Sequence, residues 1–75
     1  MIAPMGYLVV IEKTRTGYSA YVPDLPGCVA GARTRPATMR LMRQAIEMHL
    51  QDMRSRRQRV PRPSARAETL PLQSA

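Results

Sequence analysis

The chain has 75 residues, one cysteine and a formal net charge of +7 at neutral pH. A domain of this size buries only about 60% of its unfolded surface, and one cysteine excludes an internal disulfide framework, so we expect oligomerisation or a bound partner to add stability. No apolar run approaches the roughly 20 residues of a membrane span, and the first residues lack the pattern of a signal peptide. These features predict a soluble, cytoplasmic protein, since a reducing compartment suits one free thiol.

The first half of the chain predicts three antiparallel strands, near residues 6–13, 17–22 and 28–33. The apolar, β-branched run over residues 7–11 is long enough for a strand and too short for a helix. A polar segment that ends in Gly17 then indicates a hairpin turn. The second strand has to end at Pro23, because proline has no N–H to donate to a sheet.

A helical pattern begins after Thr34 and extends near residues 35–56. Thr34 is a suitable N-cap, and Pro36 is tolerated in the first turn. Apolar residues then recur every three or four positions along one face: Met39, Met42, Ile46, Leu50 and Met53. A second stripe on a neighbouring face contains Leu41, Ala45 and Met48. Because the first stripe is enough to cover the sheet, we expect the second to form an oligomer interface.

Proline and positive charge dominate the chain beyond this helix. Pro61 and Pro63 exclude further helix, and residues 67–71 are compatible with one last short strand. Residues 73–75 are expected to form a disordered tail. The sequence therefore predicts one α+β domain over residues 1–72, a three-stranded antiparallel sheet with one helix packed on one face, in the order β-β-β-α-β when the last strand is included.

Three segments, taken in order, resemble the HicB family of antitoxins. The most specific is Gly17-Tyr-Ser-Ala-Tyr-Val-Pro-Asp-Leu-Pro-Gly-Cys28, and the others are Gln44-Ala-Ile-Glu-Met-His-Leu50 and Val60-Pro-Arg-Pro-Ser64. The resemblance runs from Tyr7 to Ser64 and implies a partial ribonuclease-H-like fold. It also implies a protein that masks a small HicA-type toxin, which cleaves RNA. Full-length relatives usually carry a C-terminal DNA-binding module, and this chain ends where that module begins, so we do not expect operator binding through it.

The corner between the second and third strands is the candidate partner-binding site. Tyr18 and Tyr21 lie on opposite faces of their strand, so one packs against the helix and the other is available to a partner. Two prolines fix the backbone beside Tyr21. We therefore assign partner recognition to Tyr21, Pro23, Asp24 and Leu25.

The sequence identifies no catalytic set, no metal site and no cofactor site. Cys28 follows a rigid Pro-Gly turn and has no basic neighbour in sequence, which is typical of a buried structural thiol. Asp24 lies in a turn where its carboxylate can accept backbone hydrogen bonds, and Glu47 and Asp52 lack the spacing of neighbours on one helix face. His49, beside the apolar stripe, indicates a packed imidazole. A two-metal nuclease is therefore disfavoured, and we predict a protein that is not an enzyme.

An arginine-rich segment supports an alternative function. Residues 35–75 contain nine arginines and three acidic residues, and most of the excess lies in Arg54, Arg56, Arg57, Arg59, Arg62 and Arg66. This cluster is able to bind the phosphates of RNA or DNA, although no aromatic residues are interleaved with it to stack on bases. HicA-type toxins are basic, so the positive charge does not steer this chain towards one. A stand-alone nucleic-acid-binding protein thus remains the second hypothesis.

Overall fold

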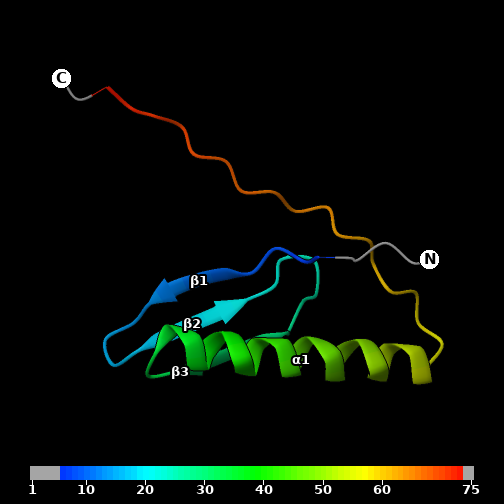
Figure 1. Ribbon diagram of the computed structural model, residues 1–75. Helices are drawn as coiled ribbons and strands as arrows, with labels where there is room; N and C mark the ends of the chain where they lie inside the picture. Colours follow the sequence, from blue (N-terminus) through cyan, green and yellow to red (C-terminus); the bar gives the residue numbers. More distant parts are fainter. Residues whose placement is uncertain (1–5, 74–75) are drawn as a thin grey trace.

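The computed structural model describes residues 6–73 and shows a three-stranded antiparallel sheet with one long helix (Figure 1). The strands are β1 (Val10–Lys13), β2 (Tyr18–Tyr21) and β3 (Val29–Ala32), paired in the order β1-β2-β3, and the helix is α1 (Arg35–Ser55). The predicted α+β class is confirmed. Each strand is shorter than the range expected for it, while the helix begins where predicted and ends one residue earlier.

A tight turn joins β1 to β2, and Gly17 is required there. The Thr14 N–H donates to the Gly17 carbonyl at 2.8 Å, and the Gly17 N–H donates to Thr14 Oγ1 at 3.1 Å. A Cβ at position 17 would lie 2.2 Å from the Ala32 carbonyl oxygen and 2.7 Å from the Arg33 Cα. Only glycine therefore allows the backbone of the turn to approach the end of β3 this closely.

The strand register separates the sheet into two faces. Because side chains alternate along a strand, the residues paired across the sheet form rows that point to one side. One row faces α1 and consists of Ile11, Ala20 and Ala30. The neighbouring row faces the side without a helix and consists of Val10, Tyr21 and Val29.

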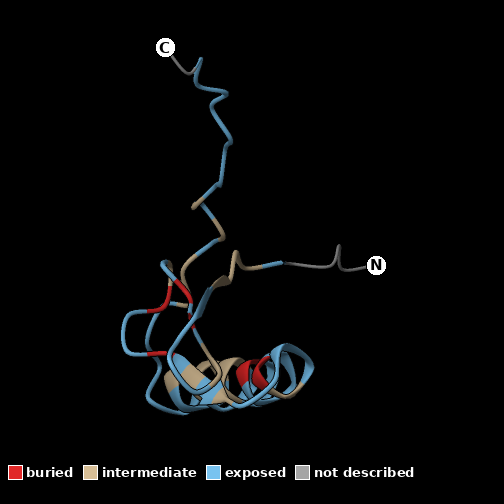
Figure 2. Cartoon of the chain, turned by 90° about the vertical axis from the view of Figure 1, so that its left-hand side faces the viewer, coloured by how far each residue is buried: buried red, intermediate tan, exposed pale blue. Residues whose placement is uncertain are grey.

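The core lies between α1 and the sheet. It is closed at one end by the corner that follows β2, which consists of residues 22–28. Met42 and Thr38 of α1 are fully buried, and Ala20 of β2 packs with Met42 in the same cluster. The corner adds three buried residues to this core, Val22, Leu25 and Cys28. In Figure 2 the buried parts of the chain, in red, are short stretches of α1 and of the segments opposite it. α1 packs against β2 and β3 and leaves β1 uncovered, so the hydrophobic layer is incomplete at that edge.

Thr34 caps the N-terminus of α1 without a reciprocal partner. Its Oγ1 accepts a hydrogen bond from the Ala37 N–H at 3.2 Å, and its carbonyl accepts bonds from both the N–H and the hydroxyl of Thr38. This arrangement confirms the predicted cap. A hydroxyl on a cap satisfies one of the free N–H groups of the first turn and contributes about 1 kcal/mol.

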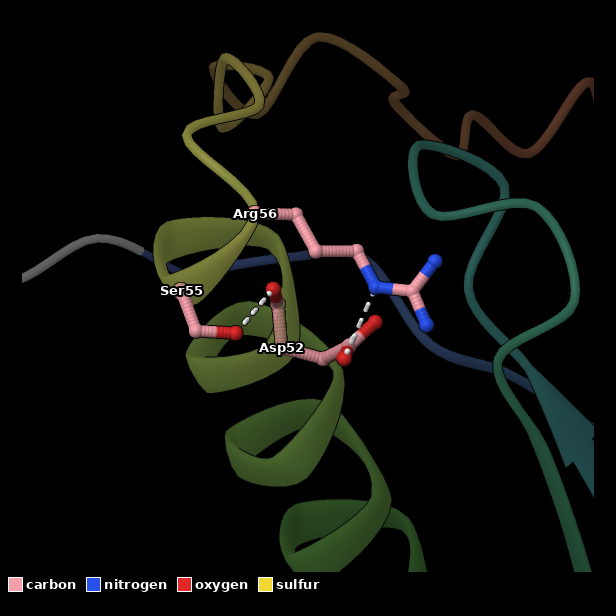
Figure 3. Close-up of polar contacts among 3 residues, drawn as sticks. All are labelled: Asp52, Ser55 and Arg56. Atoms are coloured by element: carbon pink, nitrogen blue, oxygen red, sulfur yellow. Dashed lines mark hydrogen bonds and ion pairs between the residues drawn. The ribbon is translucent and has the colours of Figure 1, made fainter.

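The C-terminus of α1 ends in a Schellman motif. The Gln58 N–H donates to the Met53 carbonyl at 2.8 Å and the Arg57 N–H to the Arg54 carbonyl at 3.0 Å, while Arg57 adopts a left-handed backbone with φ of 57°. Figure 3 shows the last turn, where Ser55 Oγ donates to the Asp52 carbonyl and Arg56 Nε pairs with the Asp52 carboxylate at 3.2 Å. The helix therefore stops before the prolines are reached.

The strand expected over residues 67–71 does not form. The whole segment from 59 to 73 has no regular secondary structure, and its last part leads away from the sheet (Figure 1). Leu70 and Leu72 are 77% and 89% exposed, so no apolar surface holds this segment against an edge strand. Residues 1–5 of the expected domain and 74–75 of the expected tail lie outside the described residues.

Candidate partner-binding surface

An exposed apolar row crosses the face of the sheet that no helix covers. Tyr21 lies at its centre on β2, paired with Val10 of β1 on one side and Val29 of β3 on the other. Tyr21 is 42% exposed, Val29 is 63% exposed and Val10 is half-buried. Three adjacent apolar side chains on an open sheet face form a surface suited to contact with another protein.

Only some residues of the corner beside Tyr21 contribute to this surface. Pro23 is exposed, but the Leu25 side chain is 1% exposed and lies in the core. Three backbone hydrogen bonds fix this geometry: Leu25 N–H to the Val22 carbonyl, Cys28 N–H to the Leu25 carbonyl, and Val22 N–H to the Cys28 carbonyl. Leu25 therefore closes the core, and its placement removes it from the surface that a partner contacts.

Asp24 is bonded within the chain. Its carboxylate accepts hydrogen bonds from the Ser64 N–H at 2.9 Å, the Ser64 hydroxyl at 2.8 Å and the Ala65 N–H at 3.1 Å. These bonds, led by the one from the Ser64 N–H, lower the pKa of Asp24 below its ordinary value. The backbone donors expected for Asp24 are thus present, but they come from the far end of the chain rather than from its own turn.

A second contact holds the same part of the chain against the segment that leads into β1. We call residues 60–65 the strap, since they follow the helix and cross back to the corner. The Tyr7 hydroxyl donates a hydrogen bond to the Pro61 carbonyl in the strap. Partial burial, and then the nearby Asp24 carboxylate, raise the pKa of Tyr7 above its ordinary value. The prolines of the strap restrict its backbone and make this docking less costly in entropy.

The basic cluster extends from the end of α1 along the strap. All six of its arginines are exposed: Arg54, Arg56, Arg57, Arg59, Arg62 and Arg66. Within residues 6–73, the only ion pair is the exposed one between Arg56 and Asp52. The remaining positive charge is therefore presented to solvent over a long, narrow region rather than gathered in one pocket.

The second stripe of α1 is only partly available. Leu41 is 42% exposed and Met48 is 70% exposed, whereas Ala45 is half-buried against the core. Met48 and Ala45 border a shallow depression formed with the start of β3. The two larger residues of the expected oligomer interface thus lie on the surface.

Cys28 and His49 occupy structural positions. The Cys28 side chain is 4% exposed, and its burial raises the pKa of the thiol, which makes the nucleophilic thiolate less accessible. His49 is half-buried beside it along the same depression. Among residues 6–73, no three histidine, cysteine, aspartate or glutamate side chains come together in a way that could hold a metal ion.

Comparison with known protein families identifies the chain. A family model described as the HicB-like antitoxin of bacterial toxin–antitoxin systems matches residues 7–72, which is most of the sequence and includes the corner and the strap. The chain belongs to the HicB-like antitoxin family.

Curated relatives of this HicB-like chain include proteins of a bacterium, two archaea and a phage. A UPF0150 protein of Helicobacter pylori is 43% identical over 44 residues, which cover 59% of this chain and 61% of the relative. A UPF0150 protein of Thermoplasma acidophilum is 30% identical over 67 residues, covering 88% of this chain and 97% of the relative. A 14.9 kDa protein of Haemophilus phage HP1 is 39% identical over 49 residues, which are 65% of this chain and 37% of that protein.

These comparisons limit how much can be transferred to the HicB-like chain. The match spans 61% of the Helicobacter relative and 37% of the phage protein, so each has sequence without a counterpart in the matched region. Within residues 6–73, no helix is both long and apolar enough to cross a membrane. The family supports an antitoxin-type role, and the partner and its contact surface are taken up below as proposals.

Sequence reasoning missed two features of the HicB-like surface. Val10 and Val29 belong to the apolar row only because the strand register places them beside Tyr21, and pairing register was not assigned from the sequence. The contact of Ser64 with Asp24 was missed as well, although both residues lie in segments that resemble the family. The resemblance of both segments to one family was the only signal for this contact, because no local pattern links residues 40 positions apart.

Proposed function

We propose that this protein binds and masks a small, RNA-cleaving toxin of the HicA type, with the open sheet face around Tyr21 as its contact surface. Family membership supports the antitoxin role. The observation that carries the choice of surface is the row of Val10, Tyr21 and Val29 on the sheet face that α1 does not cover, in which Tyr21 and Val29 are exposed.

The apolar row suits a basic partner better than the basic cluster does. A net charge of +7 repels a basic toxin at a distance, so attraction has to come from apolar contact at short range. A partly exposed tyrosine supplies a large, rigid contact area together with a hydroxyl, which is why tyrosine is common among residues that dominate binding energy. Pro23, exposed next to Tyr21, extends the surface with a backbone that is already fixed.

The remaining parts of the proposal concern setting and assembly. We place the protein in the cytoplasm, where an RNA-cleaving toxin meets its substrate, and assign it a binding role without catalysis, metal or cofactor. Self-association through the second stripe of α1 would use Leu41, Ala45 and Met48. The exposure of Leu41 and Met48 supports that interface.

Co-expression with the product of the adjacent reading frame tests the proposal. When the two proteins are purified through a tag on one of them, we expect a stoichiometric complex. We also expect co-expression to relieve the growth arrest that the toxin causes. Tyr21→Ala should weaken binding by about 2 kcal/mol, or roughly thirtyfold in Kd, while Ser19→Ala, on the same face but outside the row, should leave Kd unchanged. The proposal fails when no complex forms and toxicity persists, or when both variants bind equally well.

The second candidate function is nucleic-acid binding through the basic cluster. It is favoured by the exposure of six arginines, five of which have no ion-pair partner within the described residues. Titration of RNA and DNA at two salt concentrations decides it, because phosphate-dominated affinity falls steeply with salt. Binding that hardly changes with salt would exclude this function.

A further inference from the structure

An apolar groove lies between the first half of α1 and the segment that leads into β1. It has a volume of about 460 Å³ and is lined mainly by Tyr7, Val9, Met39, Met42 and Ile46. The groove exists because α1 packs on β2 and β3 and leaves the inner side of the β1 edge uncovered. Arg40, Arg43 and Glu47 form its charged rim, which has an excess of positive charge.

Residues 66–72 carry side chains that are complementary to this groove. Leu70 and Leu72 are the two most exposed large apolar residues of the described chain. In an extended segment, residues two apart point to the same side, so these two leucines can enter one groove together. Glu68, two positions earlier, is the only acidic residue beyond α1.

We propose that residues 66–72 of one copy, which we call the tail, dock into this groove of a second copy. Leu70 and Leu72 then cover the apolar floor formed by Met39 and Ile46, and Glu68 meets the arginines of the rim. The groove and the tail are complementary in chemistry. The groove is apolar with an excess of positive charge at its rim, and the tail carries two exposed leucines and one carboxylate.

The occupant is a second copy because of where the tail leaves its own domain. Asp24 holds the strap at Ser64 and Ala65, and in both views the tail then leads away from α1, against which the groove lies (Figures 1 and 2). In a dimer with a two-fold axis, the tail of each copy binds in the groove of the other, so every contact is made twice. This doubling compensates for the small size of one tail.

This interface is independent of the proposed toxin contact. The groove lies on the helix side of the sheet, whereas Tyr21 points to the opposite face. Self-association through the tail is therefore measured on the protein alone, and its presence or absence leaves the toxin proposal unaffected.

The experiment measures molar mass by light scattering and sedimentation over about a hundredfold range of protein concentration. The full chain should pass from monomer to dimer. Leu70→Ser combined with Leu72→Ser should raise the dimer Kd at least about thirtyfold, since the lost contacts are apolar and made twice. The leucines lie outside every helix and strand, so this variant keeps its fold. Thr69→Ala, in the same tail but with a side chain that points to the side opposite Leu70 and Leu72, is the matched control and should leave this Kd unchanged.

Two further variants test the pairing of tail with groove. Met39→Glu should block the groove, and a mixture of this variant with the leucine variant should recover heterodimers, because one protein supplies a tail and the other a groove. Glu68→Arg should weaken the dimer, and adding Arg43→Glu should restore it. The proposal is overturned by a full chain that stays monomeric, including one whose tail folds back into its own groove, or by dimers unaffected by the leucine variant. It is also overturned by dimers that dissociate on Met48→Ser instead, which would place the interface on the second stripe of α1.

Discussion

Gly17 illustrates how a single residue position determines the hairpin. Replacement by alanine puts a methyl group against backbone atoms of Ala32 and Arg33, which cannot move aside as a flexible side chain can. Gly17→Ala should therefore lower the free energy of unfolding by roughly 1–3 kcal/mol. Urea unfolding followed by circular dichroism measures this. Gly6→Ala is the matched control, since a Cβ there meets nothing within 4 Å. Equal stability of the two variants would show that the turn can open.

Arg57 is the residue at which the structure stores backbone strain. A left-handed conformation costs an L-residue with a side chain about 1 kcal/mol, and glycine adopts it freely. Arg57→Gly should therefore stabilise the protein by up to about 1 kcal/mol, seen as a higher Tm. Arg59→Gly removes the same charge at a position without positive φ and should not stabilise. A Tm lowered equally by both changes would contradict this account of the helix end.

At the scale of elements, local patterns predicted most of the fold. The three- and four-residue spacing of Met42, Ile46 and Leu50 identified α1, and Thr34 identified its start. The helix end was predicted to within one residue, but its Schellman motif was not, because the left-handed position is occupied by Arg57 instead of glycine. The apolar and polar pattern over residues 67–71 suggested a strand, but strand formation depends on a paired edge that local sequence does not reveal.

The candidate site was less predictable because it depends on contacts between distant residues. Tyr21 was placed correctly on the face opposite Tyr18, since alternation along a strand is local. Leu25 was expected at the surface because turns are usually exposed, whereas the bonded corner turns its side chain into the core. Ser64 lies 40 positions from Asp24, and no local rule links them.

The strap is the element whose stability depends on pH. Its anchor, Asp24, has a folded pKa below the ordinary 3.8, so the strap contact is fully present above that value and is lost as the pH falls through the lower folded pKa. We therefore expect the amide resonances of Ser64 and Ala65 to titrate with a midpoint below 3.8 in an NMR pH series. In Asp24→Ala these resonances should not titrate and should exchange faster. A midpoint at or above 3.8 would contradict the bonded carboxylate.

At the scale of the whole molecule, the basic cluster and the apolar row around Tyr21 lie on separate surfaces. Most of the positive charge lies along α1, the strap and the tail, while the apolar row of Tyr21 occupies the open sheet face. The two candidate functions therefore use different parts of the molecule and different forces. A phosphate-binding protein depends on the first part, and a masking protein that contacts a basic toxin depends on the second.

Ionic strength acts on these two functions with opposite sign. For a basic toxin, added salt screens the repulsion from a chain of charge +7, so the association rate constant should stay constant or rise. For single-stranded RNA, the logarithm of affinity should fall with the logarithm of salt, with a slope of about −0.7 per phosphate contact. Stopped-flow binding at several salt concentrations measures both. Arg59→Ala combined with Arg62→Ala is the decisive variant, because it should make the RNA slope shallower by about 1.4 and slightly speed the encounter with the toxin. Toxin association that slows as salt increases would show that acidic groups of the partner meet the basic cluster, and would move the contact surface from Tyr21 to the arginines.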